Sequence, residues 1–116
     1  MNLYHGFADL KPGVGDMEFA EAFADYMNHL KTQGHIETWR LTRSKLGLGI
    51  KELGEFHFMM EFKDLAQLDR AFDLVSTRAG EVEHVHHGVN AMIARVRFGL
   101  YRDFPDPNRK RGEERF

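Results

Sequence analysis

Residues 55–62 alternate between two kinds of side chain. Alternate residues of a β-strand point to opposite faces of a sheet. One row is apolar throughout and predicts a face buried in the core, because leaving three Phe rings in water would be costly. The other row carries carboxylates, an imidazole and a thioether, and we expect any chemistry on that face. The apolar row is Phe56, Phe58, Met60 and Phe62, and the mixed row is Glu55, His57, Met59 and Glu61.

Apolar residues recur at helical spacing in two segments and predict helices over residues 16–33 and 64–80. Asp64 and Gln67, three residues apart, have the spacing of a capping box at the start of the second helix. Strand-forming residues or strict alternation are found in three further stretches. The additional predicted strands cover residues 2–10, 35–45 and 91–101.

The resulting order is strand, helix, strand, strand, helix, strand. Two strand–helix–strand units with right-handed crossovers give a four-stranded antiparallel sheet with both helices on one face. This is a ferredoxin-like α+β fold (βαββαβ), and it places the first and third strands in the centre. One face of the sheet is then covered by helices, and the opposite face needs another partner or stays in water.

The uncovered face carries the candidate functional side chains. His57 and His5 lie on the two central strands, and we expect them to act as acid–base groups whose pKa values burial shifts. A hydrogen-bonded structural role for either imidazole remains an open alternative. Trp39, on an outer strand, is expected to anchor a subunit interface. The side chains expected to contact a ligand are Met59, Glu61, Arg95, Arg97 and Trp39, and Ile93 is expected on the same face.

A chain of 116 residues with 42% hydrophobic residues suits a single domain. We expect residues 1–103 to form it and residues 104–116, which lack periodicity, to form an extended or mobile tail. The formal net charge of −2 gives no support for a nucleic-acid partner. Without cysteine, disulfides and thiolate metal sites are excluded. No export signal or membrane-spanning run is visible, so we expect a cytoplasmic protein.

The predicted topology is also that of RNA-recognition motifs, in which aromatic residues of the third strand stack on bases. Phe56 and Phe58 have roughly the required spacing. Glu55, however, stands where such motifs carry Gly, and Glu61 adds a second carboxylate that would repel phosphate. The sequence therefore argues against RNA binding.

A group of histidines precedes the last predicted strand, and it suggests two different side-chain arrangements. If the segment is helical, His84 and His87 share a face and Glu83 stands beside His87, whereas in an extended segment His84 and His86 share a face. Either pair could ligate Zn²⁺ or Fe²⁺ with a carboxylate. The alternative is that these are surface histidines over buried valines. The candidate metal ligands are His84, His86 and His87.

The order of elements and the two sheet faces over residues 2–101 resemble the dimeric α+β barrel superfamily. A local similarity to its stress-responsive branch lies at the exit of the first strand, in residues 9–14. The resemblance implies that two sheets pair face to face and that a small ligand is held between sheet and helices. Because members of the superfamily differ in activity, the resemblance transfers no reaction.

The leading functional hypothesis is a homodimer whose cavity binds a small organic molecule, with proton abstraction or cofactor-independent oxygenation as the chemistry such a site supports. We expect no cofactor, because no cofactor motif is visible, and no nucleic-acid or membrane partner. Whether the protein is an enzyme is left open. The alternatives are a non-catalytic dimeric interaction module and a histidine-based metal-binding protein.

Overall fold

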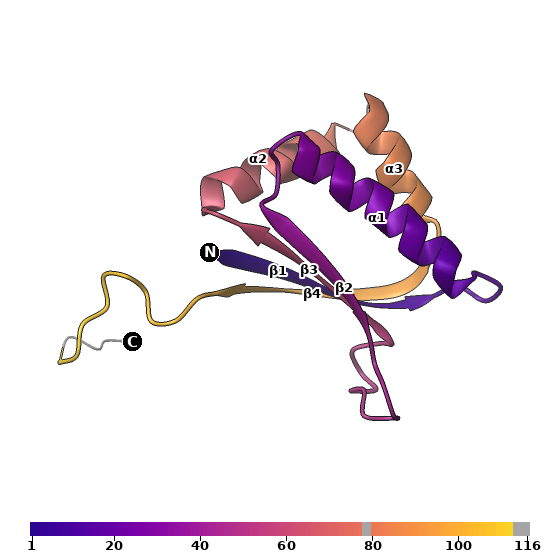
Figure 1. Cartoon of the computed structure of the whole chain (residues 1–116), viewed down its shortest axis with the longest axis horizontal. Helices are drawn as coiled ribbons and strands as arrows, with labels where there is room; N and C mark the ends of the chain where they lie inside the picture. The colour runs from indigo at the N-terminus through magenta and orange to yellow at the C-terminus, as the bar shows by residue number, and fades with distance from the viewer. Residues whose placement is uncertain (78–79, 113–116) are drawn as a thin grey trace.

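The alternating stretch lies in the middle of a four-stranded antiparallel sheet, with three helices on one face among the residues described (Figure 1). The computed structural model describes residues 1–77 and 80–112, without the side chain of Glu81. The strands are β1 (Asn2–Leu10), β2 (Thr38–Arg43), β3 (Phe56–Phe62) and β4 (Ile93–Arg102). The helices are α1 (Asp16–Thr32), α2 (Leu65–Ser76) and α3 (Gly80–Asn90). The strand order is β2–β3–β1–β4, which confirms that the first and third strands are central.

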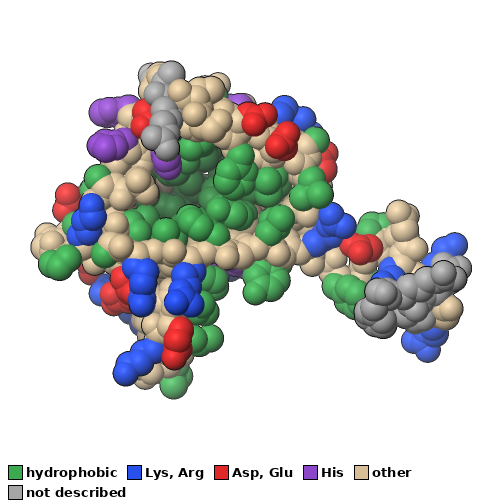
Figure 2. Space-filling view, turned by 180° about the vertical axis from the view of Figure 1, so that it is seen from behind, with side chains coloured by type: hydrophobic (Ala, Val, Ile, Leu, Met, Phe, Trp, Pro, Cys, Tyr) green, Lys and Arg blue, Asp and Glu red, His purple; other side chains and the backbone are tan. Residues whose placement is uncertain are grey.

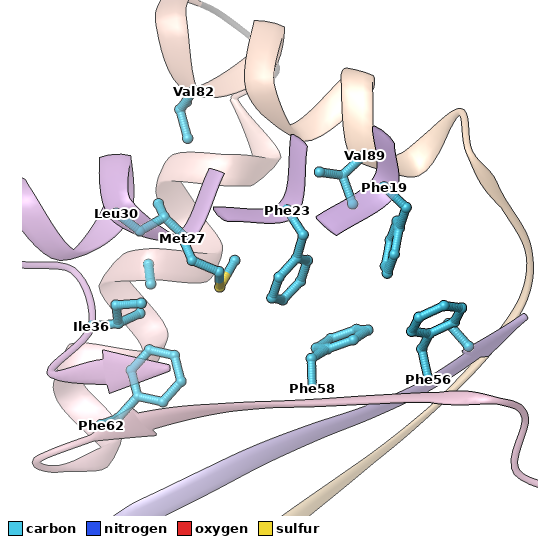
Figure 3. Close-up of a cluster of buried hydrophobic side chains, with 12 residues drawn as sticks. Phe19, Phe23, Met27, Leu30, Ile36, Phe56, Phe58, Phe62, Val82 and Val89 are labelled. Atoms are coloured by element: carbon cyan, nitrogen blue, oxygen red, sulfur yellow. The ribbon is translucent and has the colours of Figure 1, made fainter. Parts of the chain in front are cut away.

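The apolar row of β3 points toward the helices, as predicted from its alternation. Figure 3 shows the rings of Phe56 and Phe58 facing Phe19 and Phe23 of α1. The Phe19 and Phe56 ring centres are 5.2 Å apart, and those of Phe23 and Phe58 are 4.9 Å apart. Each of these rings is almost fully buried, and such burial contributes roughly 1.5–3 kcal/mol per side chain. This contact fixes which face of the sheet the helices cover.

A glycine in β1 makes room for this packing. Gly6 lies directly opposite Phe58 in the β1–β3 pairing. A Cβ atom built on Gly6 would overlap the Phe58 ring. The absence of a side chain therefore allows the ring to lie across the central strand, which explains a glycine within a strand that otherwise favours larger residues.

The start of α2 confirms Asp64 as the N-cap, while the Gln67 side chain bonds the residue before the cap and does not complete a capping box. The Asp64 carboxylate accepts a hydrogen bond from the Gln67 backbone N–H at 2.8 Å, and the Gln67 side-chain oxygen accepts one from Lys63 N–H at 2.8 Å. The Gln67 amide also donates to the Gly34 carbonyl oxygen at 3.1 Å, so this buried amide is satisfied. The helix ends at Ser76, earlier than predicted; of the predicted end at residues 79–80, Ala79 lies outside the described residues and Gly80 begins another helix.

The histidine-containing segment forms α3, a helix beyond the two that were predicted. Val82 and Val89 are buried on one face of α3, and α3 packs against α1. The helical alternative for this segment is therefore correct. Figure 1 shows α1 and α3 side by side above the sheet.

The helices cover one face of the sheet, the helix face, and leave the other, the open face, uncovered among the described residues (Figure 1). The helix face carries Tyr4 of β1 and the apolar row of β3, and the open face carries His5 of β1 and His57 of β3. The prediction that Ile93 lies on the open face is wrong. A register shift between Asp9 and Leu10 pairs Ile93 with Leu10, and Ile93 packs against the core.

The described part of the predicted tail leaves the end of β4 beside the N-terminus. The Met1 amino group lies 3.3 Å from the Asp103 carboxylate, and Asp103 N–H donates to the Met1 carbonyl oxygen at 3.3 Å. Beyond this point the chain extends away from the sheet (Figure 1), and the Phe104 ring is 82% exposed. Residues 113–116 of the predicted tail lie outside the described residues.

Candidate functional site

The two histidines predicted as catalytic lie next to each other on the open face. The His5 Nδ1 atom is 2.8 Å from the His57 Nε2 atom, and the two ring planes differ by 17°. This geometry places one proton between the two nitrogens. Two side chains that are 52 residues apart in the sequence are thus joined by the pairing of β1 with β3.

The direction of this hydrogen bond follows from a third group. The Thr42 hydroxyl donates to the His57 carbonyl oxygen at 3.1 Å, so its oxygen is left to accept from His57 Nδ1–H, also at 3.1 Å. The His57 Nε2 atom then accepts from His5 Nδ1–H. Within the described part of the chain the His5 Nε2 atom has no hydrogen-bond partner. The hydrogen-bond network therefore leaves the lone pair of His5 Nε2 free on the open face.

Aromatic rings surround the histidine pair. The Phe7 ring stacks on His57 at 4.7 Å, and the Tyr101 ring meets His5 edge-on at 5.0 Å. Burial lowers the pKa of both imidazoles, and the charge of a protonated His5 lowers the pKa of His57 further. Both rings are therefore neutral at neutral pH, the state in which an imidazole accepts a proton.

Replacing His5 by Gln is expected to raise the pKa of His57, because the repulsion from a protonated His5 is removed. Burial should still hold this pKa below the ordinary value of 6.5. NMR titration of the His57 ring measures the change. The His84→Gln variant, altered at an exposed position of α3, is the control and should leave the His57 pKa unchanged. An unchanged or lower His57 pKa in His5→Gln would show that the pair is not electrostatically coupled.

The same shifts set how stability depends on pH. The folded-state pKa values of His5 and His57 lie below the ordinary value of 6.5. At pH values between the folded-state pKa and 6.5, the unfolded chain therefore binds more protons than the folded protein. The free energy of unfolding therefore falls as the pH drops from about 6.5 through the folded-state values. Above pH 6.5 this contribution to stability is fully present.

The predicted ligand-contacting residues do not converge on one point. Arg95 forms an ion pair with Asp9 at 2.7 Å, and its guanidinium lies 3.5 Å from the Lys51 carbonyl oxygen. Arg97 lies opposite Phe7, near the histidine pair. Met59 and Glu61 occupy the open face on β3, opposite His5 and Leu3 respectively.

Trp39 lies on the helix face, away from the predicted interface position. Its ring meets Phe23 edge-on at 5.7 Å, and its indole N–H donates to the Asn28 side-chain oxygen at 3.0 Å. The strand parity explains this placement, because Trp39 pairs with Met60 of the apolar row. In the monomer Trp39 therefore anchors β2 to α1.

A cavity of about 150 Å³ lies on the helix face, between sheet and helices. Figure 2 shows a hollow lined by hydrophobic side chains beneath the helical layer. Aromatic and aliphatic residues from all three helices and from β1, β3 and β4 form its wall. The lining residues include Tyr4, Tyr26, Met27, Val75, His86 and Val96.

A few polar groups interrupt this apolar wall. The Tyr26 ring lies 5.5 Å from the His86 ring. Burial, with smaller contributions from Tyr4 and Glu83, raises the pKa of Tyr26 to about 12, and burial raises the pKa of Tyr4. Both phenols are therefore hydrogen-bond donors at neutral pH. Sequence reasoning missed them as site residues, although Tyr4 shares the parity of the inward-facing residues of β1.

The helical geometry of α3 separates His86 from the other two histidines proposed as metal ligands. His86 lines the cavity, whereas His84 and His87 are exposed. Within residues 1–77 and 80–112, no group of three or more His, Asp or Glu side chains is placed to hold a metal ion. The arrangement of α3 therefore favours a separate role for His86.

The sheet order and the helices on a single face define a ferredoxin-like α+β fold, as predicted. The chain belongs to a family described as "Family of unknown function (DUF6614)", whose model matches residues 1–116. No curated protein matches the sequence. No helix among the described residues is long and apolar enough to cross a membrane.

Solved structures with the same fold support this assignment. A protein of Arabidopsis thaliana has a TM-score of 0.69 at 13% identity, over 89% of this chain and 95% of that one. A structure titled antibiotic biosynthesis monooxygenase has a TM-score of 0.64 at 19% identity, over 90% of this chain and 100% of that one. A ferredoxin-like "dabb family" protein of Mesorhizobium loti has a TM-score of 0.65 at 19% identity, over 88% and 95%. At these identities the similarity establishes the fold alone.

Proposed function

We propose that the protein is a homodimer that binds a small, mostly apolar molecule in the cavity between sheet and helices. The observation that carries this proposal is the cavity itself, an apolar space whose wall, among the described residues, also holds two phenols, one imidazole and the side-chain amide of Asn90. Such a composition is typical of small-molecule sites, in which apolar walls hold the ligand and a few polar groups orient it.

The size of the cavity limits the ligand. A volume of about 150 Å³ is close to that of an engineered protein cavity that binds benzene. A ligand with one aromatic ring or a comparable aliphatic body therefore fits. Proton transfer is the reaction class that an imidazole and two phenols in such a wall support.

The dimer is supported by the uncovered aromatic side chains of the open face. His5, Phe7, His57 and Tyr101 form a contiguous cluster there, and Tyr101 is 62% exposed. Pairing with the open face of a second copy would remove these rings from water, with a gain of roughly 25 cal/mol per Å² of apolar area. It would also give each sheet a second covered face.

Filling the cavity should weaken ligand binding. We expect Val75→Phe to weaken the binding of toluene by at least about tenfold, because the added ring occupies the space of the ligand. NMR chemical shifts of the Met27 and Val96 methyl groups measure binding. Leu65→Phe is the matched control, since Leu65 is on the same helix but 47% exposed and outside the cavity wall. If toluene leaves the methyl shifts of the unaltered protein unchanged, the proposal fails.

A further inference from the structure

The cavity wall includes the imidazole of His86, which lies beside a carboxylate. His86 and Glu83 lie one turn apart on α3, and the His86 Nδ1 atom is 3.7 Å from the Glu83 Oε2 atom. Both atoms are buried, and neither has a hydrogen-bond partner among the described residues. A carboxylate beside Nδ1 favours the tautomer with the proton on Nδ1, as second-shell carboxylates do for other functional histidines. That tautomer leaves the lone pair on Nε2.

We propose that His86 is the general base of the cavity, that Glu83 positions and supports it, and that the ligand is an uncharged, ring-sized molecule with a weakly acidic hydroxyl group. This inference rests on the proposed function, because it assumes that the cavity holds a small organic molecule. It adds the base, its supporting residue and the chemical class of the ligand.

The charges around the cavity determine the class of ligand. None of the described residues in the cavity wall is Lys or Arg. The Glu83 carboxylate, which is close enough to affect Tyr26, adds a negative charge behind the wall. An anionic ligand would lose its hydration without gaining a cation, which is costly. A neutral hydroxyl compound avoids this cost until its proton is transferred.

The proton transfer is balanced within the cavity. The ligand O–H bond breaks, the proton moves to His86 Nε2, and the electron pair stays on the ligand oxygen. The imidazolium then lies beside the Glu83 carboxylate, and the phenol hydroxyls of Tyr26 and Tyr4 are the donors available to the ligand oxyanion. Because the pKa of Tyr26 is raised to about 12, this phenol keeps its own proton.

Three probe molecules of similar size separate these steps. Nitrobenzene tests binding alone, 4-nitrophenol reports ionisation through the visible absorbance of its phenolate, and 4-nitrobenzoate tests the exclusion of anions. We expect nitrobenzene to bind at least about tenfold more tightly than 4-nitrobenzoate, and the ionisation constant of 4-nitrophenol to rise about tenfold on binding, a shift of about one pKa unit.

His86→Gln should remove the shift in the ionisation constant of bound 4-nitrophenol. Glu83→Gln should reduce this shift and move the pH midpoint of the ionisation of bound 4-nitrophenol. A purely structural role of Glu83 would not change that midpoint. His84→Phe, at an exposed position on the same helix, is the control and should ionise 4-nitrophenol as the unaltered protein does. Nitrobenzene binding, measured on each variant, reports whether the cavity persists.

The outcomes distinguish the two proposals. If nitrobenzene does not bind the unaltered protein, the proposed function fails. If nitrobenzene binds but 4-nitrophenol keeps its solution ionisation constant, or 4-nitrobenzoate binds equally well, the inference fails and the binding function stands. The inference also fails if the Glu83→Gln variant still binds nitrobenzene and shows the full rise in the ionisation constant of 4-nitrophenol. This test does not depend on whether the His86→Gln variant folds.

Discussion

Phe23→Ala is expected to lower the free energy of unfolding by about 3–5 kcal/mol. The Phe23 side chain is 1% exposed and contacts Phe19, Trp39 and Phe58. Its removal takes away a fully buried ring and enlarges the existing cavity, which the surrounding aromatic side chains cannot close without leaving their own contacts. Urea denaturation followed by circular dichroism measures the change.

Phe104→Ala removes the same ring from a position that is 82% exposed and is the matched control. Its free energy of unfolding should differ from that of the unaltered protein by less than about 0.5 kcal/mol. If the two substitutions lower the free energy of unfolding by similar amounts, the apolar row of β3 does not form the core with α1. The assignment of the two sheet faces is then wrong.

Phe7→Glu is expected to convert the proposed dimer to a monomer. The Phe7 ring lies in the middle of the open face, stacked on His57 and opposite Arg97. In a face-to-face dimer each Glu would be buried near its symmetry-related copy, and burying such like charges costs several kcal/mol. Light scattering after size exclusion should change from twice the chain mass of 13.5 kDa to the chain mass itself.

Met17→Glu adds the same charge on α1, at a position that is 64% exposed and on the helix side of the molecule. This variant should remain a dimer. Thermal unfolding of both variants verifies that the fold is retained. A dimeric, folded Phe7→Glu protein would place the subunit contact elsewhere, and a monomeric unaltered protein would remove the homodimer from the proposal.

Local patterns predicted most of the fold. The alternation of residues 55–62 identified the buried face of β3, and the spacing of Asp64 and Gln67 identified the start of α2. Each of these signals depends on the period of a strand or on a cap, which neighbouring residues determine. The sequence order of these elements then left few possible topologies.

The contacts within the sites depend on register, which the sequence did not provide. His5 and His57 were each predicted as candidates, but their 2.8 Å separation results from the pairing of β1 with β3. The register shift that turns Ile93 inward likewise leaves no local signal. The position of α3 over the sheet brings His86 beside Tyr26, and this contact joins two helices that are distant in the sequence.

The central strands serve both sides of the sheet with adjacent residues. Tyr4 faces the cavity and the next residue, His5, faces outward, and in the same way Phe58 follows His57. In the proposed dimer, a ligand that shifts either strand would therefore also alter the contact between the two subunits. If ligand binding changes the association constant of the subunits by some factor, dimerisation must change the affinity for the ligand by the same factor. Ligand titrations at several protein concentrations would therefore measure the coupling energy between ligand binding and dimerisation.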